Sequence, residues 1–309
     1  MTLEQELRAS FGSAVERDAP LAPLTTFKVG GPADWLVTVA SVSALARAVE
    51  IARRHGVPVT VLGGGSNVLV ADRGLPGVVV RVRGGEIRET PGGVRADAGV
   101  TINGLVRWML NRGLAGLEAW AGTPGTVGGA VRGNAHFQGR LIGERIARVA
   151  LLCADGRIAV VPQAEMEFGY DTSRPQRTGE VVLWAEFRAE PGDPAVLRHT
   201  ARASLAYRKA TQPLDSPSAG CIFRNPDPTR DRLPDGLPPS AGALIDRAGL
   251  KGARAGGAMI SPTHANFIVN TGGATAADIR RLVERCKREV RERFGIELRE
   301  EIVYLGAFA

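Results

Sequence analysis

The sequence has 309 residues, of which 44% are apolar and 23% charged, an ordinary composition for a globular protein of two or three domains. It contains no apolar run long enough to span a membrane, and Met1 to Phe11 lacks the apolar core of a signal peptide. Its three cysteines, Cys153, Cys221 and Cys286, form no CxxC pair, which favours a reducing compartment. We therefore expect a cytoplasmic protein.

The net charge of +7 and the isoelectric point near 9.9 make nucleic-acid binding one interpretation. However, the basic residues are spread along the whole chain, and aromatic residues, which stack on bases, make up only 5% of it. A substrate or cofactor that carries phosphates explains the excess charge better. We expect a monomer with no nucleic-acid partner and no membrane partner.

The first clear pattern lies between residues 41 and 82. Apolar residues at helical spacing predict a helix that stops at Gly56, just before Pro58. Val59–Leu62 and Val78–Val82 are short apolar strands. Between them, the segment Gly63-Gly64-Gly65-Ser66-Asn67 is either a plain tight turn or an anion-binding nest, in which several backbone N–H groups point at one ligand.

A second glycine-rich segment, Gly122 to Asn134, follows a helix predicted over Thr101–Arg112. So many glycines favour a backbone that is pressed against a ligand, most simply a diphosphate at the start of a helix. Neither segment matches the GxGxxG pattern of a Rossmann site or the GxxxxGK[ST] pattern of a P-loop. Both of those nucleotide sites are therefore disfavoured.

The second half of the chain mixes strands, loops and one clear helix. Alternating apolar residues between Val149 and Arg188 predict antiparallel strands. Glu190 to Pro194 has the composition of a linker, and Pro226 to Pro239 that of a surface loop. A capping signature at Thr275 begins an amphipathic helix near the C-terminus. The pattern indicates an α+β fold in several small layers, without internal repeats.

Seven segments resemble the UDP-N-acetylenolpyruvoylglucosamine reductases, occur in the order of that family and span nearly the whole chain. They are Thr26–Ala33 (TFKVGGPA), Leu62–Val70 (LGGGSNVLV), Gly116–Gly129, Ser218–Pro226 (SAGCIFRNP), Ala241–Gly252, His264–Asn270 (HANFIVN) and Leu298–Ile302 (LREEI). Each motif alone is weak, and the set together is highly specific. The stretch from Glu190 to Tyr207 lacks a tyrosine-bearing insertion, so the chain resembles the shorter members of the family.

The resemblance implies an α+β fold with a two-part FAD-binding module of the vanillyl-alcohol-oxidase type, over residues 1–84 and 85–204, and a substrate-binding domain over residues 205–309. It implies non-covalent FAD and NADPH as reductant. UDP-N-acetylglucosamine enolpyruvate is then reduced to UDP-N-acetylmuramate for peptidoglycan synthesis. The FAD diphosphate is assigned to the two glycine-rich segments, through Gly63, Gly64, Gly65, Ser66, Asn67, Gly122, Thr123, Gly125, Thr126, Gly128 and Gly129.

The implied reaction adds a hydride to C3 of the enolpyruvyl ether and a proton to C2, while negative charge develops on the carboxylate side. By position, Cys221 stands where many members have a serine acid, and Glu301 matches the glutamate that helps to stabilise the intermediate. The residues at the UDP-sugar contact positions are Lys209, Asn225, Lys251 and His264. No HExxH motif or clustered His/Cys spacing supports a metal, and we expect none.

Each of these residues has a purely structural alternative. A free cysteine such as Cys221 is usually a small buried filler, and a glutamate such as Glu301 is usually solvated. A lone histidine is more often structural than catalytic. Two other functions also stay open: a different flavin oxidoreductase with the same FAD fold, and a nucleotide-sugar-binding protein that has lost its activity.

The clearest departure from the family is at Asp171. The family pattern Phe-Gly-Tyr-Arg-x-Ser corresponds here to Phe168–Ser173, with an aspartate in place of the arginine that polarises the substrate carboxylate. An anion cannot perform the electrostatic task of that arginine. Either Arg174 or Arg177 takes its place, or the local alignment is shifted, or the activity is altered. We expect Arg174, held by Asp171 through a bidentate contact.

Overall fold

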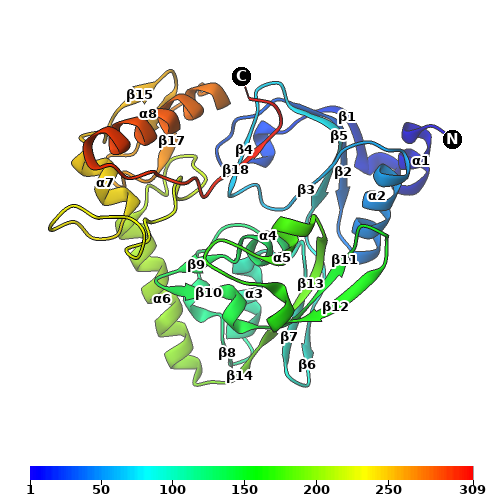
Figure 1. Cartoon of the computed structure of the whole chain (residues 1–309). Coiled ribbons are helices and arrows are strands. Elements are labelled where there is room, and N and C mark those ends of the chain that lie inside the picture. Colours follow the sequence, from blue (N-terminus) through cyan, green and yellow to red (C-terminus); the bar gives the residue numbers. More distant parts are fainter. Residues whose placement is uncertain (309) are drawn as a thin grey trace. The chain divides into compact units, whose positions relative to one another are not determined.

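The computed structural model describes residues 1–308, which divide into two compact units (Figure 1). Unit 1 comprises residues 1–19, 34–64 and 76–207. Unit 2 comprises residues 20–33, 65–75 and the chain from 208 onward. Within the described residues, no helix is both long enough and apolar enough to cross a membrane.

Unit 1 is built from two larger sheets and the helices around them. Its helices are α1 (Leu3–Phe11), α2 (Val42–Arg54), α3 (Ile102–Leu110), α4 (Val127–Gly133), α5 (Arg174–Thr178) and most of α6 (Pro194–Thr211). One sheet has the strand order β1 (Val15–Pro20), β2 (Pro32–Val39), β5 (Leu75–Val82) and β3 (Val59–Leu62). The other, which is antiparallel, has the order β12 (Ile158–Pro162), β11 (Ile146–Leu152), β13 (Val181–Arg188), β7 (Gly93–Asp97) and β6 (Ile87–Thr90).

Two short strand pairs complete unit 1. They are β9 (His136–Phe137) with β10 (Arg140–Leu141), and β8 (Leu114–Ala115) with β14 (Glu190–Pro191). The antiparallel strands predicted between residues 149 and 188 are confirmed as β11, β12 and β13, with Val149 opposite Ala185 in the register. The parallel pair β3 and β5, in which Val59 stands opposite Val78, confirms the two strands predicted around the first glycine-rich segment.

Helix α2 lies where the sequence predicts it, between a capping serine and a glycine stop. The Ser41 side chain accepts a hydrogen bond from the Ala44 amide at 3.2 Å, which satisfies one of the free amides of the first turn. The apolar face is buried in the core of unit 1. After the helix, Gly56 adopts a positive φ of 64°, a conformation that glycine reaches without steric cost. The predicted stop at Gly56 is confirmed.

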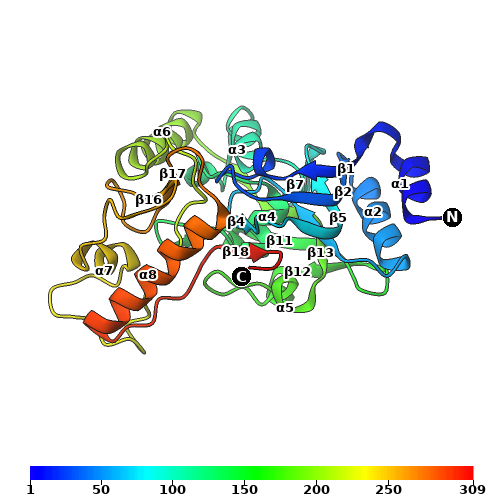
Figure 2. The ribbon, with the colours of Figure 1, turned by 90° about the horizontal axis from the view of Figure 1, so that it is seen from above.

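Unit 2 has its own core and two helices, α7 (Ala241–Arg247) and α8 (Ala276–Phe294). Its strands form an antiparallel sheet of β15 (Arg254–Ala255), β16 (Ala258–Ile260) and β17 (Ile268–Asn270), and a parallel pair of β4 (Val68–Val70) and β18 (Val303–Leu305). Helix α8, drawn in orange in Figure 2, packs against β15 and β16. The predicted surface loop between residues 226 and 239 contains neither helix nor strand.

The predicted C-terminal helix is confirmed as α8, together with its cap. The Thr275 hydroxyl accepts from the Asp278 amide, and the Asp278 carboxylate accepts from the Thr275 amide, both at 3.0 Å. The buried stripe consists of Ile279, Leu282, Val283, Cys286 and Val290. Residues at this spacing share one face of a helix, so burial of that face stabilises α8 against the sheet.

The linker predicted over Glu190–Pro194 is wrong in part. Glu190 and Pro191 form β14 and pair with β8, and α6 begins at Pro194. The sequence pattern does not indicate α6, because the buried positions of this helix lack the usual apolar stripe. They are Leu197, Ala201, Ser204 and Arg208, of which only the first is a large apolar residue.

The predicted segments 1–84, 85–204 and 205–309 also differ from the two units of the structure. Residues 20–33 and 65–75 belong with the C-terminal part of the chain. The reason is long-range pairing: β4 lies beside β18, and the Asp72 carboxylate accepts hydrogen bonds from the Ala276 and Ala277 amides at 2.7 and 3.0 Å. A division of the FAD-binding module at residue 84 stays a prediction.

We expect Asp72→Ala to destabilise the protein by about 1–2 kcal/mol. The substitution leaves two amides in the first turn of α8 without their carboxylate acceptor and removes a negative charge from the positive end of the helix dipole. Urea unfolding followed by circular dichroism measures the change. The exposed loop residue Asp235 supplies the control, because Asp235→Ala should shift stability by less than about 0.5 kcal/mol. Equal effects of the two substitutions would contradict the capping role of Asp72.

Candidate active site

The segment Gly63–Asn67 leaves the end of β3 with several amides available for a ligand. Within residues 1–308, the amides of Gly64, Gly65 and Ser66 donate to no acceptor. Gly65 has a φ of 61° and is buried, and its carbonyl accepts from the Thr26 amide at 3.0 Å. Three consecutive free donors on a glycine-rich turn are typical of an anion-binding nest. The structure therefore favours the nest over the plain turn.

The second glycine-rich segment uses most of its amides internally. The Val127 amide donates to the Val100 carbonyl at 2.8 Å, and the Gly128 amide donates to the Ala98 carbonyl at 2.9 Å. The Thr126 side chain caps α4 by accepting from the Gly129 amide. Within residues 1–308, the amides of Gly125 and Thr126 donate to no acceptor. Contacts to a ligand through the amides of Gly128 and Gly129, which the sequence predicts, would require these internal bonds to open.

The two segments meet inside unit 1 at Gly64 and Gly125. A Cβ atom on Gly64 would lie 2.8 Å from the Cα atom of Gly125, and one on Gly63 would collide with the Thr126 hydroxyl. No side chain fits between them, so both segments present bare backbone with free N–H groups. This arrangement fits the diphosphate of a dinucleotide, which is bound well by clustered backbone donors.

We expect Gly64→Ala to weaken FAD binding by about 10- to 100-fold, because the new methyl group meets backbone that cannot rotate away. Gly64 has no positive φ, so this effect arises from space rather than from backbone strain. Gly92→Ala is the matched control, since a Cβ atom there meets nothing within 4 Å. Flavin absorbance per protein after dialysis measures the loss. Equal flavin contents of the two variants would contradict the close approach of the two segments as the basis of binding.

Cys221 and Glu301 are 80 residues apart in the sequence, and backbone hydrogen bonds hold their segments together in unit 2. The Glu301 amide donates to the Ile222 carbonyl at 2.8 Å, and Phe223 forms a β-bridge with Glu300. Cys221 is half-buried and immediately precedes this bridge. The structure thus brings the two predicted catalytic residues onto neighbouring backbone segments.

Two asparagine side chains fix these segments further. Asn266 is buried, and its amide group exchanges two hydrogen bonds with the Phe223 backbone, at 2.7 and 2.9 Å. The Asn67 side chain donates to the Glu301 carbonyl at 3.1 Å. Asn67 therefore supports the candidate catalytic glutamate through its side chain, a role that the sequence does not predict.

Of the other two cysteines, only Cys286 lies in a core. It belongs to the buried stripe of α8, where burial raises the pKa of its thiol to about 12. Cys153 is half-buried, and burial together with Glu180 raises the pKa of its thiol. Both are therefore protonated and poorly reactive at neutral pH.

Arg208 is a functional candidate that sequence reasoning missed. Its side chain is 6% exposed on α6, and burial lowers the pKa of its guanidinium to about 10. Cys221 is its electrostatic neighbour, so a cation that stays charged at neutral pH lies close to the candidate acid. A buried guanidinium that keeps its charge close to Cys221 makes Arg208 a candidate residue of the site. The neighbouring Lys209, predicted to contact substrate, is exposed.

Of the remaining predicted substrate residues, Lys251 and His264 lie close together, and Asn225 lies at the start of α7. Lys251 donates to Asp246 at 2.7 Å in an exposed ion pair. The positive charge of Lys251 also lowers the pKa of the His264 imidazole. The Asn225 side chain is exposed and accepts from the Ala241 amide at the start of α7. The structure therefore brings Lys251 and His264 together and gives part of Asn225 a structural role.

His264 is partly buried, and its protonation state follows from its surroundings. Burial, and then the positive charge of Lys251, lower the pKa of the imidazole below its usual value. Nδ1 accepts from the Asn266 amide at 3.2 Å, so in the neutral ring the proton is on Nε2. His264 thus offers a neutral N–H donor, a group suited to a phosphate or sugar oxygen.

The predicted contact between Asp171 and Arg174 is wrong. Arg174 donates through Nε and Nη2 to the two carboxylate oxygens of Glu180, each at 2.8 Å. Arg177 donates to both oxygens of Glu167 at 2.6 Å. Asp171 instead accepts from the Nδ1 atom of His136, at 3.0 Å. The sequence does not reveal these partners, because Glu180 and Glu167 both lie outside the Phe168–Ser173 motif. A catalytic role for Arg174 stays a prediction.

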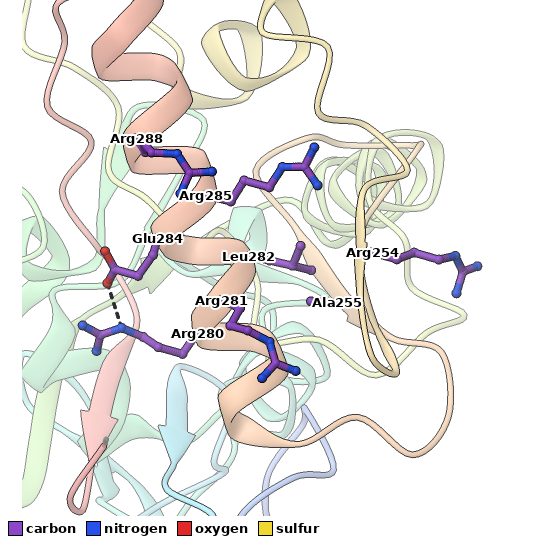
Figure 3. Close-up of a pocket in the computed structure, with 8 residues that line it drawn as sticks. All are labelled: Arg254, Ala255, Arg280, Arg281, Leu282, Glu284, Arg285 and Arg288. Carbon is purple, nitrogen blue, oxygen red and sulfur yellow. Dashed lines mark hydrogen bonds and ion pairs between the residues drawn. The ribbon is translucent and has the colours of Figure 1, made fainter.

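A hollow of about 480 Å³ lies elsewhere in unit 2, between β15 and α8 (Figure 3). It is lined by Arg254, Ala255, Arg280, Arg281, Leu282, Glu284, Arg285 and Arg288, none of which is a predicted site residue. Several of these arginines are paired, as Arg280 is with Glu284 at 2.8 Å in Figure 3. Part of the basic excess of the chain therefore lies on α8 and β15, away from the predicted site residues.

Two family models match the chain, and between them they cover both units in part. Residues 33–161 match the FAD binding domain, and residues 212–305 match the C-terminal domain of UDP-N-acetylenolpyruvoylglucosamine reductase. The first match contains Gly63 to Asn67 and Gly122 to Gly129. The second contains Cys221 and Glu301. The predicted fold class, α+β with an FAD-binding module of the vanillyl-alcohol-oxidase type, is confirmed.

Full-length relatives agree with these matches. The UDP-N-acetylenolpyruvoylglucosamine reductase of Synechococcus sp. strain WH7803 is 42% identical, over 94% of this chain and 93% of the relative. That of Bacillus subtilis strain 168 is 40% identical, over 98% of this chain and 97% of the relative. The crystal structure of UDP-N-acetylenolpyruvylglucosamine reductase (MurB) from Thermus caldophilus aligns with a TM-score of 0.78 at 37% identity, covering 94% of this chain and 99% of that one.

Proposed function

Since the chain belongs to the UDP-N-acetylenolpyruvoylglucosamine reductases, we propose that Cys221, Glu301 and Arg208 carry the proton and charge-stabilising steps of that reaction. The protein is a flavoenzyme, a UDP-N-acetylmuramate dehydrogenase. It reduces UDP-N-acetylglucosamine enolpyruvate with NADPH in the synthesis of the peptidoglycan precursor UDP-N-acetylmuramate. The observation that carries the residue assignment is the hydrogen-bonded juxtaposition of the Cys221 and Glu301 segments.

The overall reaction consumes NADPH, one proton and the enolpyruvyl substrate, and yields NADP⁺ and the lactyl ether. Bound FAD would supply the hydride-transfer chemistry that links NADPH to C3 of the substrate. The free amides of Gly64, Gly65, Ser66, Gly125 and Thr126 would hold its diphosphate. The same cradle excludes side chains, which lets the cofactor approach the backbone closely.

The protein residues handle the charge and the proton. Glu301, in its protonated form, donates a hydrogen bond to the negative charge that develops on the carboxylate side of the substrate. The Cys221 thiol donates its proton to C2, and the S–H bond breaks as the C–H bond forms. The buried guanidinium of Arg208 stabilises the thiolate that remains.

The UDP-sugar is bound by Lys209, Asn225, Lys251 and His264. Lysines 209 and 251 supply positive charge to the diphosphate, and the Nε2–H of His264 supplies a neutral donor. The enzyme acts as a monomer in the cytoplasm and binds neither nucleic acid nor membrane. The arginines of the α8 hollow are not needed for these roles.

The proposed function is tested on the purified full-length protein. We expect a yellow protein from which acid releases intact FAD, and NADPH oxidation that depends on UDP-N-acetylglucosamine enolpyruvate. Covalently attached flavin would indicate a different oxidoreductase of the same fold. Substrate binding without any substrate-dependent NADPH oxidation would favour the alternative of a nucleotide-sugar-binding protein. Either result would overturn the proposed enzyme.

We expect Cys221→Ala to lower the rate of substrate reduction by about 100- to 10,000-fold, because alanine has no proton to donate. Cys221→Ser should keep measurable activity, since a hydroxyl is also a donor. Flavin reduction by NADPH, followed by stopped-flow absorbance at 450 nm without substrate, should be unchanged in both. The half-buried Cys153 supplies the control, and Cys153→Ala should have parental activity. Parental turnover of Cys221→Ala would return Cys221 to a structural role.

A further inference from the structure

The hollow between β15 and α8 is lined mainly by arginine side chains (Figure 3). Five arginines and one glutamate line it, so the lining carries a net charge of +4. Its volume of about 480 Å³ is typical of a small-molecule site. Leu282 and Ala255 supply apolar surface, and none of the lining residues is aromatic. The hollow therefore offers positive charge to a small anion, but no ring on which a nucleic-acid base could stack.

Three of the arginines form a stripe along one face of α8. Arg281, Arg285 and Arg288 follow one another at intervals of four and three residues, the spacing of side chains that share a helix face. All three are exposed, and their positions span about 10 Å of helix length. Like charges at this spacing destabilise a helix, so a bound anion would relieve their repulsion.

The acidic neighbours of this stripe leave much of its charge uncompensated. Within residues 1–308, Arg285 has neither a hydrogen bond nor an ion pair. Arg288 lies 3.5 Å from Glu289, and Arg293 lies 3.6 Å from the same carboxylate. Exposed pairs of this kind contribute little to stability. The guanidinium groups of Arg285 and Arg288 are therefore available to a ligand.

The other edge of the hollow carries Arg254, in β15. Its Nη1 atom donates to the Thr271 hydroxyl at 3.2 Å, a neutral acceptor that leaves the charge of the guanidinium unpaired. The one acid of the lining, Glu284, is bound by Arg280 at 2.8 Å. In Figure 3 this pair extends from the side of α8 opposite to Arg285. Uncompensated positive charge thus reaches the hollow from both a strand and a helix.

Close packing fixes the two edges of the hollow relative to each other. Gly256, between β15 and β16, approaches α8 so closely that a Cβ atom there would collide with the Asp278 carboxylate. The same carboxylate completes the cap of α8 at Thr275 and pairs with Arg281. The hollow is therefore formed before a ligand binds, which reduces the ordering that binding would require.

We propose that this hollow is a second anion-binding site, which takes a small anion with two or more phosphate groups. A guanidinium group binds phosphate oxygens through two parallel N–H donors. The stripe is too long for a single phosphate group to contact all of its members, whereas a chain of phosphates reaches several of them. Free diphosphate and the phosphates of a nucleotide present the same chemistry. The site contains none of the residues assigned to the reaction, so it does not depend on the proposed function.

Calorimetric titration of the FAD-loaded, full-length protein with inorganic diphosphate tests the proposal. It is performed at about 0.15 M salt, which screens attraction between widely separated surface charges. We expect saturable binding with a Kd that Arg285→Ala raises about tenfold, the loss of one charge-assisted hydrogen bond. Arg254→Ala should have a similar effect from the other edge of the hollow.

A second titration, with ATP, distinguishes the two sources of the phosphates. A Kd similar to that of diphosphate, or a weaker one, would indicate recognition of the phosphates alone, as for a free phosphate anion. A tighter Kd for ATP would indicate that the hollow also contacts the nucleoside. Each result supports the anion site, provided that Arg285→Ala weakens binding.

Arg291 supplies the matched control. It is also an exposed arginine of α8, but it lies outside the lining of the hollow and 3.6 Å from Glu297. Arg291→Ala removes the same charge from the same helix, and should leave the Kd of diphosphate within about twofold of the parental value. Far-UV circular dichroism should show the same helix content in all three variants, because each replaced side chain is exposed.

Three results would overturn the proposal. The first is the absence of diphosphate binding by the parent protein. The second is an equal effect of Arg285→Ala and Arg291→Ala, which would indicate general attraction to a basic helix. The third is parental binding in Arg285→Ala or in Arg254→Ala. That outcome would assign the anion to one edge alone or to other residues, such as the glycine-rich segments. None of the three affects the proposed function, which depends on substrate-dependent NADPH oxidation.

Discussion

The parallel pairing of β4 with β18 places the end of the first glycine-rich segment beside Glu301. Val68 stands opposite Val303, the Val303 amide donates to the Asn67 carbonyl at 3.0 Å, and the Asn67 side chain donates to the Glu301 carbonyl at 3.1 Å. The Glu301 amide continues the network to Ile222, next to Cys221. A candidate cofactor segment and two candidate catalytic residues thus share one set of hydrogen bonds. Such preorganisation holds reacting groups in place without further ordering during the reaction.

Burial lowers the pKa of two side chains in unit 2, Arg208 and His264, with different results for their charge. Arg208 keeps its charge at neutral pH, because burial lowers its pKa only to about 10. His264 loses its charge, because burial and Lys251 lower an imidazole pKa that already starts near neutrality. The same physical effect therefore yields a cation beside Cys221 and a neutral N–H donor beside Lys251.

The surroundings of Asp171 are fixed by contacts within unit 1. The aspartate is neither solvated nor paired with the arginine that follows it, and it accepts from His136. Arg174 and Arg177 are each bound by a carboxylate close in sequence, Glu180 and Glu167. The Asn134 side chain donates to the Gly169 carbonyl and so helps to fix the backbone turn that carries Asp171.

The sequence by itself determined the features that depend on near neighbours: α2 with its stop at Gly56, α8 with its cap at Thr275, the strands of residues 149–188, and the two glycine-rich segments. Its motifs also determined the family, the cofactor and the substrate, because each motif is a short contiguous segment that can be recognised without the fold. Only the tertiary structure decided which charges pair, that Arg208 is buried, and that residues 20–33 and 65–75 belong with the C-terminal part. It also showed α6, whose buried stripe is mostly small or polar. The physical reason is that periodicity and capping act within a few residues, whereas burial and ion pairing depend on residues far apart in the chain.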